Sequence, residues 1–479
     1  MTKNNFYITT TLPYVNSVPH IGFALEVIQA DIIARYRRLK GDNVFFNFGT
    51  DEHGQKIWQK AKEEGRDVKE YVDFYAESFK RLKGALNLSY DAFIRTTDPH
   101  HEKSAMELWK RSLANGDIEK KKYKGLYCVG CELFLKESEL VDEKCPNHPN
   151  LIPEEIEEEN YFFKFSKYQK QLLSYLKKDD VILPDWRRQE AIKFVESGLE
   201  DFSISRLKER MSWGVDVPGD SKHTMYVWFD ALSNYISTLG WPEDKDGNFE
   251  KFWNNGKKVQ YAGKDQVRFQ SLMWQAMLLS AGIQNTDTVV YHGFVTSSNQ
   301  KMSKSLGNVI DPFLIVEEYG TDALRYFMAR EISTFDDSDF TMERFHEAYT
   351  ANLVNGLGNL TSRIMRMAVS YDIDLTEEEK KMSVYAGGED EYLEKYEIGK
   401  KADEIWQFIG FLDATIQKEE PFKLIKTNPD KAKKIVHELL YHLLGVALMI
   451  EPFMPETSEK IKRAIKEHKM PEPLFPRKA

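Results

Sequence analysis

The first fifty residues contain short apolar runs on either side of one long amphipathic stretch. Residues 6–11 are aromatic or β-branched and lead into Leu12-Pro13, which predicts a strand followed by a loop. From Ile21 apolar residues recur every three or four positions until Gly41, which predicts a helix. Residues 44–48 predict a second strand. A strand, a helix and a strand in this order are typical of a parallel sheet, whose ligands bind beyond the carboxyl ends of the strands.

A second set of such elements follows much later in the chain. Residues 258–262 and 288–295 predict strands, and residues 266–280 predict the helix between them. Both sets fit one Rossmann-like sheet that an insertion divides. From about Ala348 the pattern changes to helical stripes interrupted by a polar connection at 372–391, and the first stripe consists of Leu353, Leu357, Leu360, Ile364 and Met367.

The predicted fold class is therefore α/β, with a split Rossmann-like parallel sheet followed by an α-helical bundle. The sheet domain is expected in two parts, at residues 1–116 and 226–295, and the insertion at residues 117–225. Residues 296–347 connect the sheet to the bundle, which is expected at residues 348–479.

Composition places the chain among ordinary globular proteins. It has 479 residues, of which 42% are hydrophobic, and a net charge of −10, so its overall charge does not point to nucleic acid. An RNA-binding face would have to be local, and the basic candidates, each also readable as solvated surface, are Arg35, Arg37, Arg38, Lys40, the run at 120–124, Lys431, Lys433 and Lys434. No secretory signal and no apolar run of membrane-spanning length is evident, so we expect a cytoplasmic protein without a membrane partner.

All three cysteines lie between residues 128 and 145. Cys128 and Cys131 form one short pair, and Cys145 and His148 form another after a gap of hairpin size. Three thiolates and one imidazole complete a tetrahedral site with no position left for a substrate, which predicts one structural zinc ion. The alternative is three unrelated buried thiols and a surface histidine.

Two separated segments have the chemistry of phosphate binding. His20-Ile21-Gly22-Phe23 opens the first predicted helix, where unpaired N–H groups and the helix dipole favour an anion, although His20 could instead cap the helix. Lys301-Met302-Ser303-Lys304-Ser305 follows a strand and a polar turn and places two ammonium groups on a loop. Together they predict that the chain binds ATP and uses it to activate a small carboxylic substrate.

In this order and on these elements, the two segments resemble the signature pair of class I aminoacyl-tRNA synthetases. The resemblance narrows to the methionyl-tRNA synthetase family through the stretches at residues 11–16, 49–54, 226–231, 263–265, 292–294 and 301–305. It implies that L-methionine and ATP, with Mg²⁺, give methionyl-adenylate and that the methionyl group then passes to tRNA(Met). It also implies a stem-contact role for residues 296–347 and an anticodon-binding role for the bundle.

The resemblance further implies roles for individual residues. Those facing the phosphates in catalysis are His20, Lys301 and Lys304, and those around the rest of the nucleotide are Gly22, Gly293 and Asp265, the last of which could otherwise cap a helix. The methionine-binding set is Leu12, Tyr14, Asp51, Trp228, Ala231, Tyr235, Phe269, Gln270 and Trp274, whose aromatic members would otherwise read as core. The anticodon-binding set is Asn359, Arg363 and Phe422.

This chain departs from the family pattern at Phe23 and Gln270, where many relatives have histidine, and at Phe422, where tryptophan is common. One alternative is a class I synthetase for another apolar amino acid, but the insertion is too short for the editing domain that such enzymes need. The other is a non-catalytic tRNA-binding relative, against which His20, Asp51, Lys301 and Lys304 argue. A monomer is expected.

The zinc site gives a direct prediction. Purified protein should contain one zinc ion per chain by elemental analysis, and Cys145→Ser should lower that content because it removes one of four ligands. Substoichiometric zinc in the unaltered protein, or unchanged zinc in Cys145→Ser, would contradict the assignment.

Overall fold

A computed structural model describes most of the chain, namely residues 3–129, 133–135, 137, 140–146, 150–297, 300–302, 308–381, 384–385 and 389–478, with only the backbone of Leu133, Phe134 and Lys301. Within these ranges no helix combines the length and the apolar character needed to cross a bilayer.

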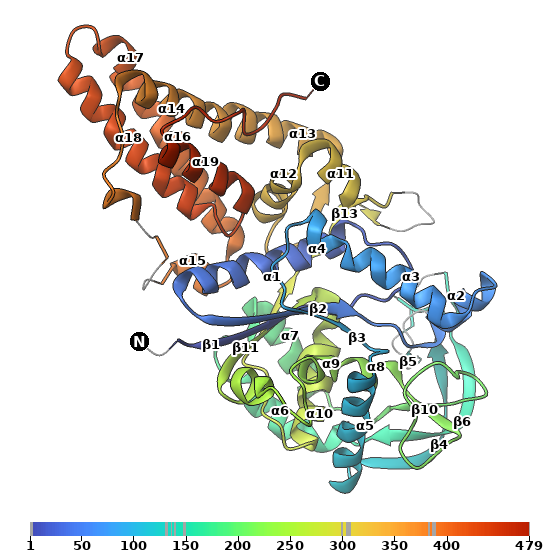
Figure 1. The fold of residues 1–479 in the computed structure, drawn as a ribbon. Helices are drawn as coiled ribbons and strands as arrows, with labels where there is room; N and C mark the ends of the chain where they lie inside the picture. The colour runs from blue at the N-terminus through green and yellow to red at the C-terminus, as the bar shows by residue number, and fades with distance from the viewer. Residues whose placement is uncertain are drawn as a thin grey trace.

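A six-stranded parallel sheet forms the centre of the larger part of the molecule (Figure 1). Its strands, in spatial order, are β3 (Ala92–Arg95), β2 (Asn43–Thr50), β1 (Asn5–Thr9), β11 (Gly256–Gly263), β12 (Thr288–His292) and β7 (Ile182–Leu183). Ile8 of β1 pairs with Phe46 on one side and with Val259 on the other. The prediction that one sheet combines both parts of the chain is therefore confirmed.

Two elements of the second half differ from their predicted form. The strand expected at 288–295 ends at His292, and Val295–Ser297 instead forms β13 in a separate small sheet with β14 (Gln300–Lys301) and β15 (Ser338–Phe340). The break lies at Gly293, where a Cβ would come within 2.1 Å of the backbone of Asp336. The helix expected at 266–280 is regular only in α10 (Trp274–Ser280), after a 3₁₀ turn and a π-helical stretch over Val267–Met273.

Helix α1 (Ile21–Lys40) covers one face of the sheet and is buried along most of its length. It begins at His20, and Gly41 ends it in the left-handed conformation with φ of 104°. The predicted helix therefore has the expected limits. Further helices of this half are α2 (Gln55–Glu63), α3 (Val68–Lys80), α4 (Leu82–Ala85) and α5 (Pro99–Ala114).

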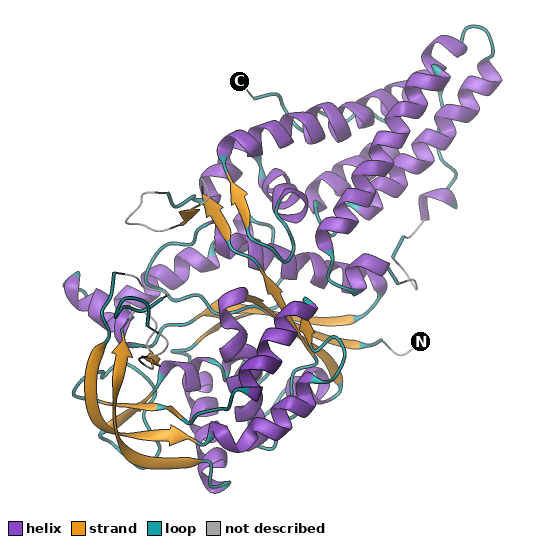
Figure 2. Ribbon diagram, turned by 180° about the vertical axis from the view of Figure 1, so that it is seen from behind, coloured by secondary structure: helices purple, strands orange, loops and turns teal. Residues whose placement is uncertain are grey.

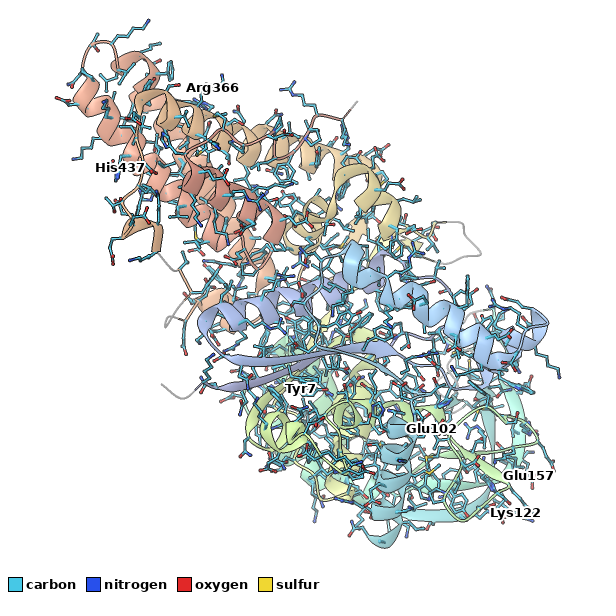
Figure 3. All side chains as sticks on the ribbon, in the orientation of Figure 1. Tyr7, Glu102, Lys122, Glu157, Arg366 and His437 are labelled. Atoms are coloured by element: carbon cyan, nitrogen blue, oxygen red, sulfur yellow. The ribbon has the colours of Figure 1, made fainter. Side chains whose placement is uncertain are left out.

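Between the two halves lies an antiparallel sheet with the order β5-β4-β6-β8. Its strands are β4 (Ile118–Cys128), β5 (Leu133–Leu135), β6 (Glu154–Phe163) and β8 (Phe202–Ser203), and a hairpin of β9 (Ser205–Leu207) and β10 (His223–Met225) follows. Lysines of β4 face glutamates of β6, and Figure 3 shows Lys122 and Glu157 at this edge of the molecule. Residues 165–196, with α6 (Gln169–Leu176) and α7 (Asp185–Glu196), contribute β7 to the main sheet.

The C-terminal part is helical and extends away from the sheets (Figure 2). Its helices are α11 (Pro312–Tyr319), α12 (Thr321–Tyr326), α13 (Met342–Ala348), α14 (Asn359–Tyr371), α15 (Glu391–Glu394), α16 (Ile398–Glu419), α17 (Pro421–Leu424), α18 (Pro429–Met449) and α19 (Pro455–Glu467). The predicted stripe from Leu353 to Met367 is buried, because it packs against the other long helices.

Arg325 of α12 connects the helical part to the sheet domain. Its buried guanidinium donates to the carbonyl oxygens of Phe453 (2.8 Å), Pro452 (2.8 Å) and Leu86 (3.1 Å) and forms an ion pair of 2.8 Å with Asp31 of α1. Burial alone would raise the pKa of Asp31, but Arg325 and Arg35 lower it below its usual value. The carboxylate is therefore ionised and paired at neutral pH.

Arg325→Met should lower the free energy of unfolding by about 3–5 kcal/mol, because it removes one of the two guanidinium groups that pair with buried Asp31 and leaves three carbonyl oxygens without their donor. Urea denaturation followed by circular dichroism measures this loss. The matched control is Lys60→Met, which breaks an exposed pair with Glu63 and should cost less than about 0.5 kcal/mol. Equal midpoints for the two variants would contradict the role given to Arg325.

Candidate functional site

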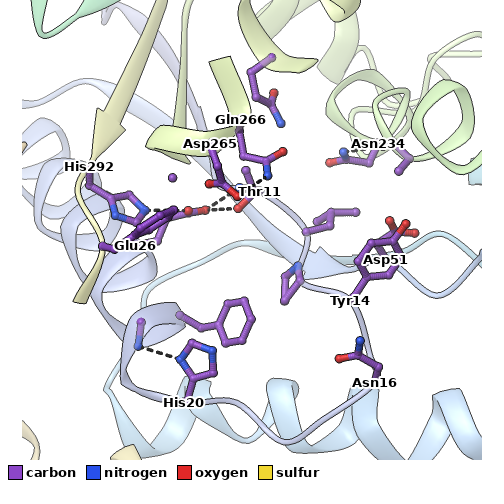
Figure 4. A pocket seen from close by; sticks show the side chains of 18 of the residues that line it. Thr11, Tyr14, Asn16, His20, Glu26, Asp51, Asn234, Asp265, Gln266 and His292 are labelled. Atoms are coloured by element: carbon purple, nitrogen blue, oxygen red, sulfur yellow. Dashed lines mark hydrogen bonds and ion pairs between the residues drawn. The ribbon is translucent and has the colours of Figure 1, made fainter. Parts of the chain in front are cut away.

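A cavity of about 430 Å³ lies at the carboxyl ends of β1, β2, β11 and β12 (Figure 4). Its walls come from the loop after β1, the first turns of α1, the loop after β2, and the two short helices α8 (Val227–Ala231) and α9 (Asn234–Ser237). The predicted site residues that line it are Leu12, Tyr14, His20, Gly22, Asp51, Trp228, Ala231, Tyr235, Asp265, Gln270 and Gly293.

His20 is the N-cap of α1, and its Nδ1 accepts a hydrogen bond of 3.0 Å from the backbone N–H of Gly22. Burial lowers the pKa of His20 to about 4, so the imidazole is neutral at pH 7. Because Nδ1 accepts, the ring proton lies on Nε2. Capping and ligand binding are therefore compatible, since one nitrogen holds the helix start and the other remains a donor.

The residues next to His20 fix its ring. A Cβ on Gly22 would come within 2.8 Å of the imidazole, so glycine lets the ring fold back over the helix start. The ring centroid of Phe23 lies 4.3 Å from that of His20, and the rings of Phe23 and Phe79 make a T-shaped contact with centroids 5.3 Å apart. Phe23 thus supports the imidazole by packing.

Glu26 and His292 form a buried pair that the sequence analysis missed. Glu26 accepts hydrogen bonds from the N–H (2.7 Å) and hydroxyl (2.6 Å) of Thr11 and contacts His292 Nε2 at 2.9 Å. The other ring nitrogen of His292 lies 2.8 Å from the carbonyl oxygen of Gly293, so both nitrogens face acceptors and both must donate. Burial acts to lower the pKa of His292, but Glu26 raises it. The sequence did contain one signal for this pair, because Glu26 is a charged residue within a helix that is buried along most of its length.

One side of the cavity combines a carboxylate with aromatic rings. Asp51 is 3% exposed, and its backbone exchanges hydrogen bonds with Pro13 and Val15 in the loop after β1. Two further lining residues are joined to each other, because the amide of Gln270 donates to the hydroxyl of Tyr235 at 2.5 Å. Figure 4 shows Tyr14, Asp51 and Asn234 at this side and Glu26, His292 and Asp265 at the other.

Phe269 and Trp274 lie behind the cavity wall. The ring of Phe269 stacks on Trp228 with centroids 3.7 Å apart, and the fully buried Trp274 packs against Tyr235 at 5.7 Å. Both support lining residues, so they act on the cavity through their neighbours. Apolar periodicity in the sequence does not distinguish these two positions from lining positions, because Trp274 is buried and Phe269 is partly buried in the same apolar cluster.

Asp265 lies in the 3₁₀ turn Lys264–Gln266 that follows β11, and its exposed side chain lines the cavity. Its carboxylate folds back over Gly263, where a Cβ would lie 2.9 Å from Oδ1. Neither the 3₁₀ turn over Lys264–Gln266 nor the π-helical stretch over Val267–Met273 has a side-chain hydrogen bond that caps its start. Asp265 therefore does not cap a helix in this structure, which was the alternative to a role in nucleotide binding.

The second predicted phosphate-binding segment, residues 301–305, is described only in part. The backbone of Lys301 pairs with Thr296 in the small sheet, and Met302 lines the cavity. The side chain of Lys301 and all of residues 303–307, including Lys304, lie outside the described residues.

Two of the four predicted zinc ligands are described. Cys128 and Cys145 are buried in one small cluster with Leu135, which suits a pair of thiolates on one ion. Cys131 and His148 lie outside the described residues, and within those that are described no group of three or more metal-ligating side chains is found.

In the helical part, Asn359 and Arg363 belong to α14 and Phe422 to α17. Asn359 is exposed, Phe422 is 44% exposed, and Arg363 forms an ion pair with Asp413 of α16.

The basic candidates near the sheets are largely paired with acidic groups. Arg37 and Lys40 contact Glu394 at 2.5 and 2.6 Å, and Lys124 contacts Glu155 at 2.9 Å. Arg37 is buried and Lys40 is partly buried, so these two residues are not the solvated surface that the sequence suggested, whereas Lys124 is exposed.

Comparisons with known proteins agree with this geometry. The family described as "tRNA synthetases class I (M)" matches residues 6–151 and 149–365, and "Anticodon binding domain of methionyl tRNA ligase" matches residues 375–476. Methionine–tRNA ligase of Thermotoga maritima is 41% identical and that of Fusobacterium nucleatum 39%, over 96% and 97% of this chain and 75% and 74% of the relatives.

Among solved structures, Mycobacterium tuberculosis methionyl-tRNA synthetase in complex with methionyl-adenylate superposes with a TM-score of 0.90 at 32% identity. The match covers 99% of this chain and 100% of that one. The chain therefore belongs to the methionyl-tRNA synthetase family of class I tRNA synthetases.

Proposed function

We propose that this chain is a methionine–tRNA ligase. It activates L-methionine with ATP to give methionyl-adenylate and pyrophosphate, and it transfers the methionyl group to the 3′ end of tRNA(Met). The observation that carries the proposal is one cavity with a carboxylate and aromatic rings on one side and a helix start with a neutral imidazole on the other. The size and membership of this cavity suit a small amino acid next to a nucleotide.

The amino acid would occupy the side of Asp51. Its α-ammonium would pair with that carboxylate, and its thioether would contact Trp228 and Tyr235, because aromatic rings favour polarizable sulfur. Leu12, Tyr14, Ala231 and Gln270 would complete the wall, with Phe269 and Trp274 behind it.

The nucleotide would occupy the side of His20. The methionine carboxylate attacks the α-phosphorus, the bond to the bridging oxygen breaks, and pyrophosphate leaves with the electron pair. Nε2–H of His20 would donate to a phosphoryl oxygen as charge develops there. Lys301 and Lys304 would hold the leaving pyrophosphate, whose charge the Mg²⁺ bound to ATP would reduce. Asp265 would bind the ribose beside Gly22 and Gly293.

The remaining parts would serve tRNA and stability. A structural zinc ion would be held by Cys128, Cys131, Cys145 and His148, and the burial of two of these thiols together fits that donor set. A base stacked on exposed Phe422, with Asn359 and Arg363 reading base edges, would place the anticodon on the bundle. We assign catalysis to residues 1–116 and 226–295, the zinc site to residues 117–225, contact with the tRNA stem to residues 296–347 and anticodon binding to residues 348–479.

ATP–pyrophosphate exchange with a panel of amino acids tests this function. Exchange with methionine alone is the expected result, and charging of tRNA(Met) should follow in the same preparation. Exchange with another amino acid would show that the enzyme is a synthetase for that amino acid. If no amino acid supports exchange, the chain is better explained as a non-catalytic tRNA-binding protein.

His20→Asn separates capping from catalysis. The Asn carboxamide oxygen can still accept from Gly22 N–H, but the donor at the position of Nε2 is lost, so we expect kcat of exchange to fall about 10²–10³-fold. The control is His20→Ala, which removes the cap as well and should cost about 1 kcal/mol more in stability. Retained kcat in His20→Asn would contradict the role of Nε2.

The pH behaviour provides a further check on the same residue. Because the folded pKa of His20 is about 4, below the ordinary value near 6.5, its contribution to stability is present above pH 6.5 and is lost as pH falls towards 4.

A further inference from the structure

Asp230 lies at the centre of a buried cluster beneath the amino-acid side of the cavity. One carboxylate oxygen, Oδ2, is 2.7 Å from Nδ1 of His53, and the other, Oδ1, is 2.9 Å from Nε2 of His101. The opposite nitrogen of His101 is 2.9 Å from the hydroxyl of Ser237. These four side chains are at most 4% exposed and come from four separate segments of the chain.

Each segment that meets at Asp230 carries a wall of the cavity or supports one. Asp230 itself belongs to α8, between Trp228 and Ala231, which line the cavity. His53 lies two residues after Asp51. Ser237 belongs to α9, which also carries the lining residues Asn234 and Tyr235. His101, in the first turn of α5, holds the cluster from below; Figure 3 shows Glu102, its neighbour, at the start of that helix.

The short helices at this wall need such a link. Helix α8 has five residues and α9 has four, and segments of this length are not stable through their own hydrogen bonds. Trp228 is only partly buried, and its stacking partner Phe269 comes from the irregular π-helical stretch. The cluster is therefore well placed to hold the aromatic wall at a fixed distance from Asp51.

The electrostatics of the cluster favour a charged, persistent contact. Burial alone would raise the pKa of Asp230, but the imidazoles of His53 and His101 lower it to about 2. Burial alone would lower the pKa of His53, but Asp230 raises it above its usual value. An ionised carboxylate with both oxygens engaged is costly to move, because any displacement leaves a buried charge unpaired.

We propose that Asp230 is a positioning residue that sets the width of the methionine pocket. By holding α8 and α9 to the Asp51 loop, it keeps the aromatic wall and the ammonium-binding carboxylate at the separation that methionine requires. This inference rests on the proposed function. Asp230 would act through Trp228, Ala231 and Asp51 and would not touch the substrate itself.

The test uses Asp230→Asn, which keeps the shape of the side chain but removes its charge and one acceptor. The contacts between the pocket and the methionine side chain are the same in the bound substrate and in the transition state. Loss of these contacts should therefore raise KM without changing kcat. We expect KM for methionine in ATP–pyrophosphate exchange to rise between about tenfold and a hundredfold, with kcat and KM for ATP within about twofold of the unaltered enzyme. His101→Gln, which disturbs the cluster from α5, should change the same parameter in the same direction.

The matched control is Asp117→Asn. Asp117 is also a buried carboxylate in a polar cluster, with Asn115, Lys167, Tyr168 and Ser280. Among the described residues, neither Asp117 nor these four partners line the cavity. This variant should lower the unfolding temperature and leave KM for methionine unchanged, which separates a loss of stability from a loss of positioning.

The outcomes are distinguishable. If the unaltered protein supports no methionine-dependent exchange, the proposed function fails. If the unaltered protein does support exchange, two results overturn the positioning role. One is an unchanged KM for methionine in Asp230→Asn and His101→Gln, and the other is an equal rise of KM for methionine and KM for ATP. If Asp230→Asn does not fold, His101→Gln and Asp117→Asn still decide between the two roles.

Discussion

The position of β1 between β2 and β11 is the constraint on which the site depends. Asn5 to Thr9 pair on one side with Asn43 to Asn47 and on the other with Gly256 to Gln260, so one short strand joins distant parts of the chain in a single register. Because all these strands are parallel, their carboxyl ends meet at one edge. The loops with His20, Asp51 and Asp265 therefore converge on the same cavity, although none is near the others in sequence.

Helix α1 extends the influence of this arrangement to the helical part. Its first turns carry His20 and Glu26 at the cavity. Further along, Asp31 pairs with Arg325, and near its end Arg37 and Lys40 contact Glu394 of α15. The same helix thus contacts the cavity at one end and the C-terminal helices along its outer face.

Local patterns in the sequence predict much of this structure. The helix from Ile21 to Gly41 and the buried stripe from Leu353 to Met367 follow from the spacing of apolar residues alone. The break after His292 does not, because it results from the close approach of Gly293 to Asp336, which is a tertiary contact. The pairing of Glu26 with His292 and of Asp230 with His53 and His101 joins residues far apart in the chain, which periodicity does not detect. Family motifs identify most lining residues but do not separate those that line the cavity, such as Trp228, from those behind it, such as Phe269.

Three buried carboxylates, Glu26, Asp31 and Asp230, have in common that each links separate segments of the chain. Buried ion pairs are a poor source of net stability, because desolvation offsets most of their attraction and apolar residues of the same shape often serve as well. Buried ion pairs instead fix the relative orientation of the segments that they join. A hydrogen-bonded charge has one favourable geometry, whereas apolar surfaces can shift against each other at little cost. Two of these carboxylates border or underlie the cavity and the third holds the helix that enters it. Their positions are therefore better explained by the geometry that two-substrate chemistry requires than by the stability of the fold.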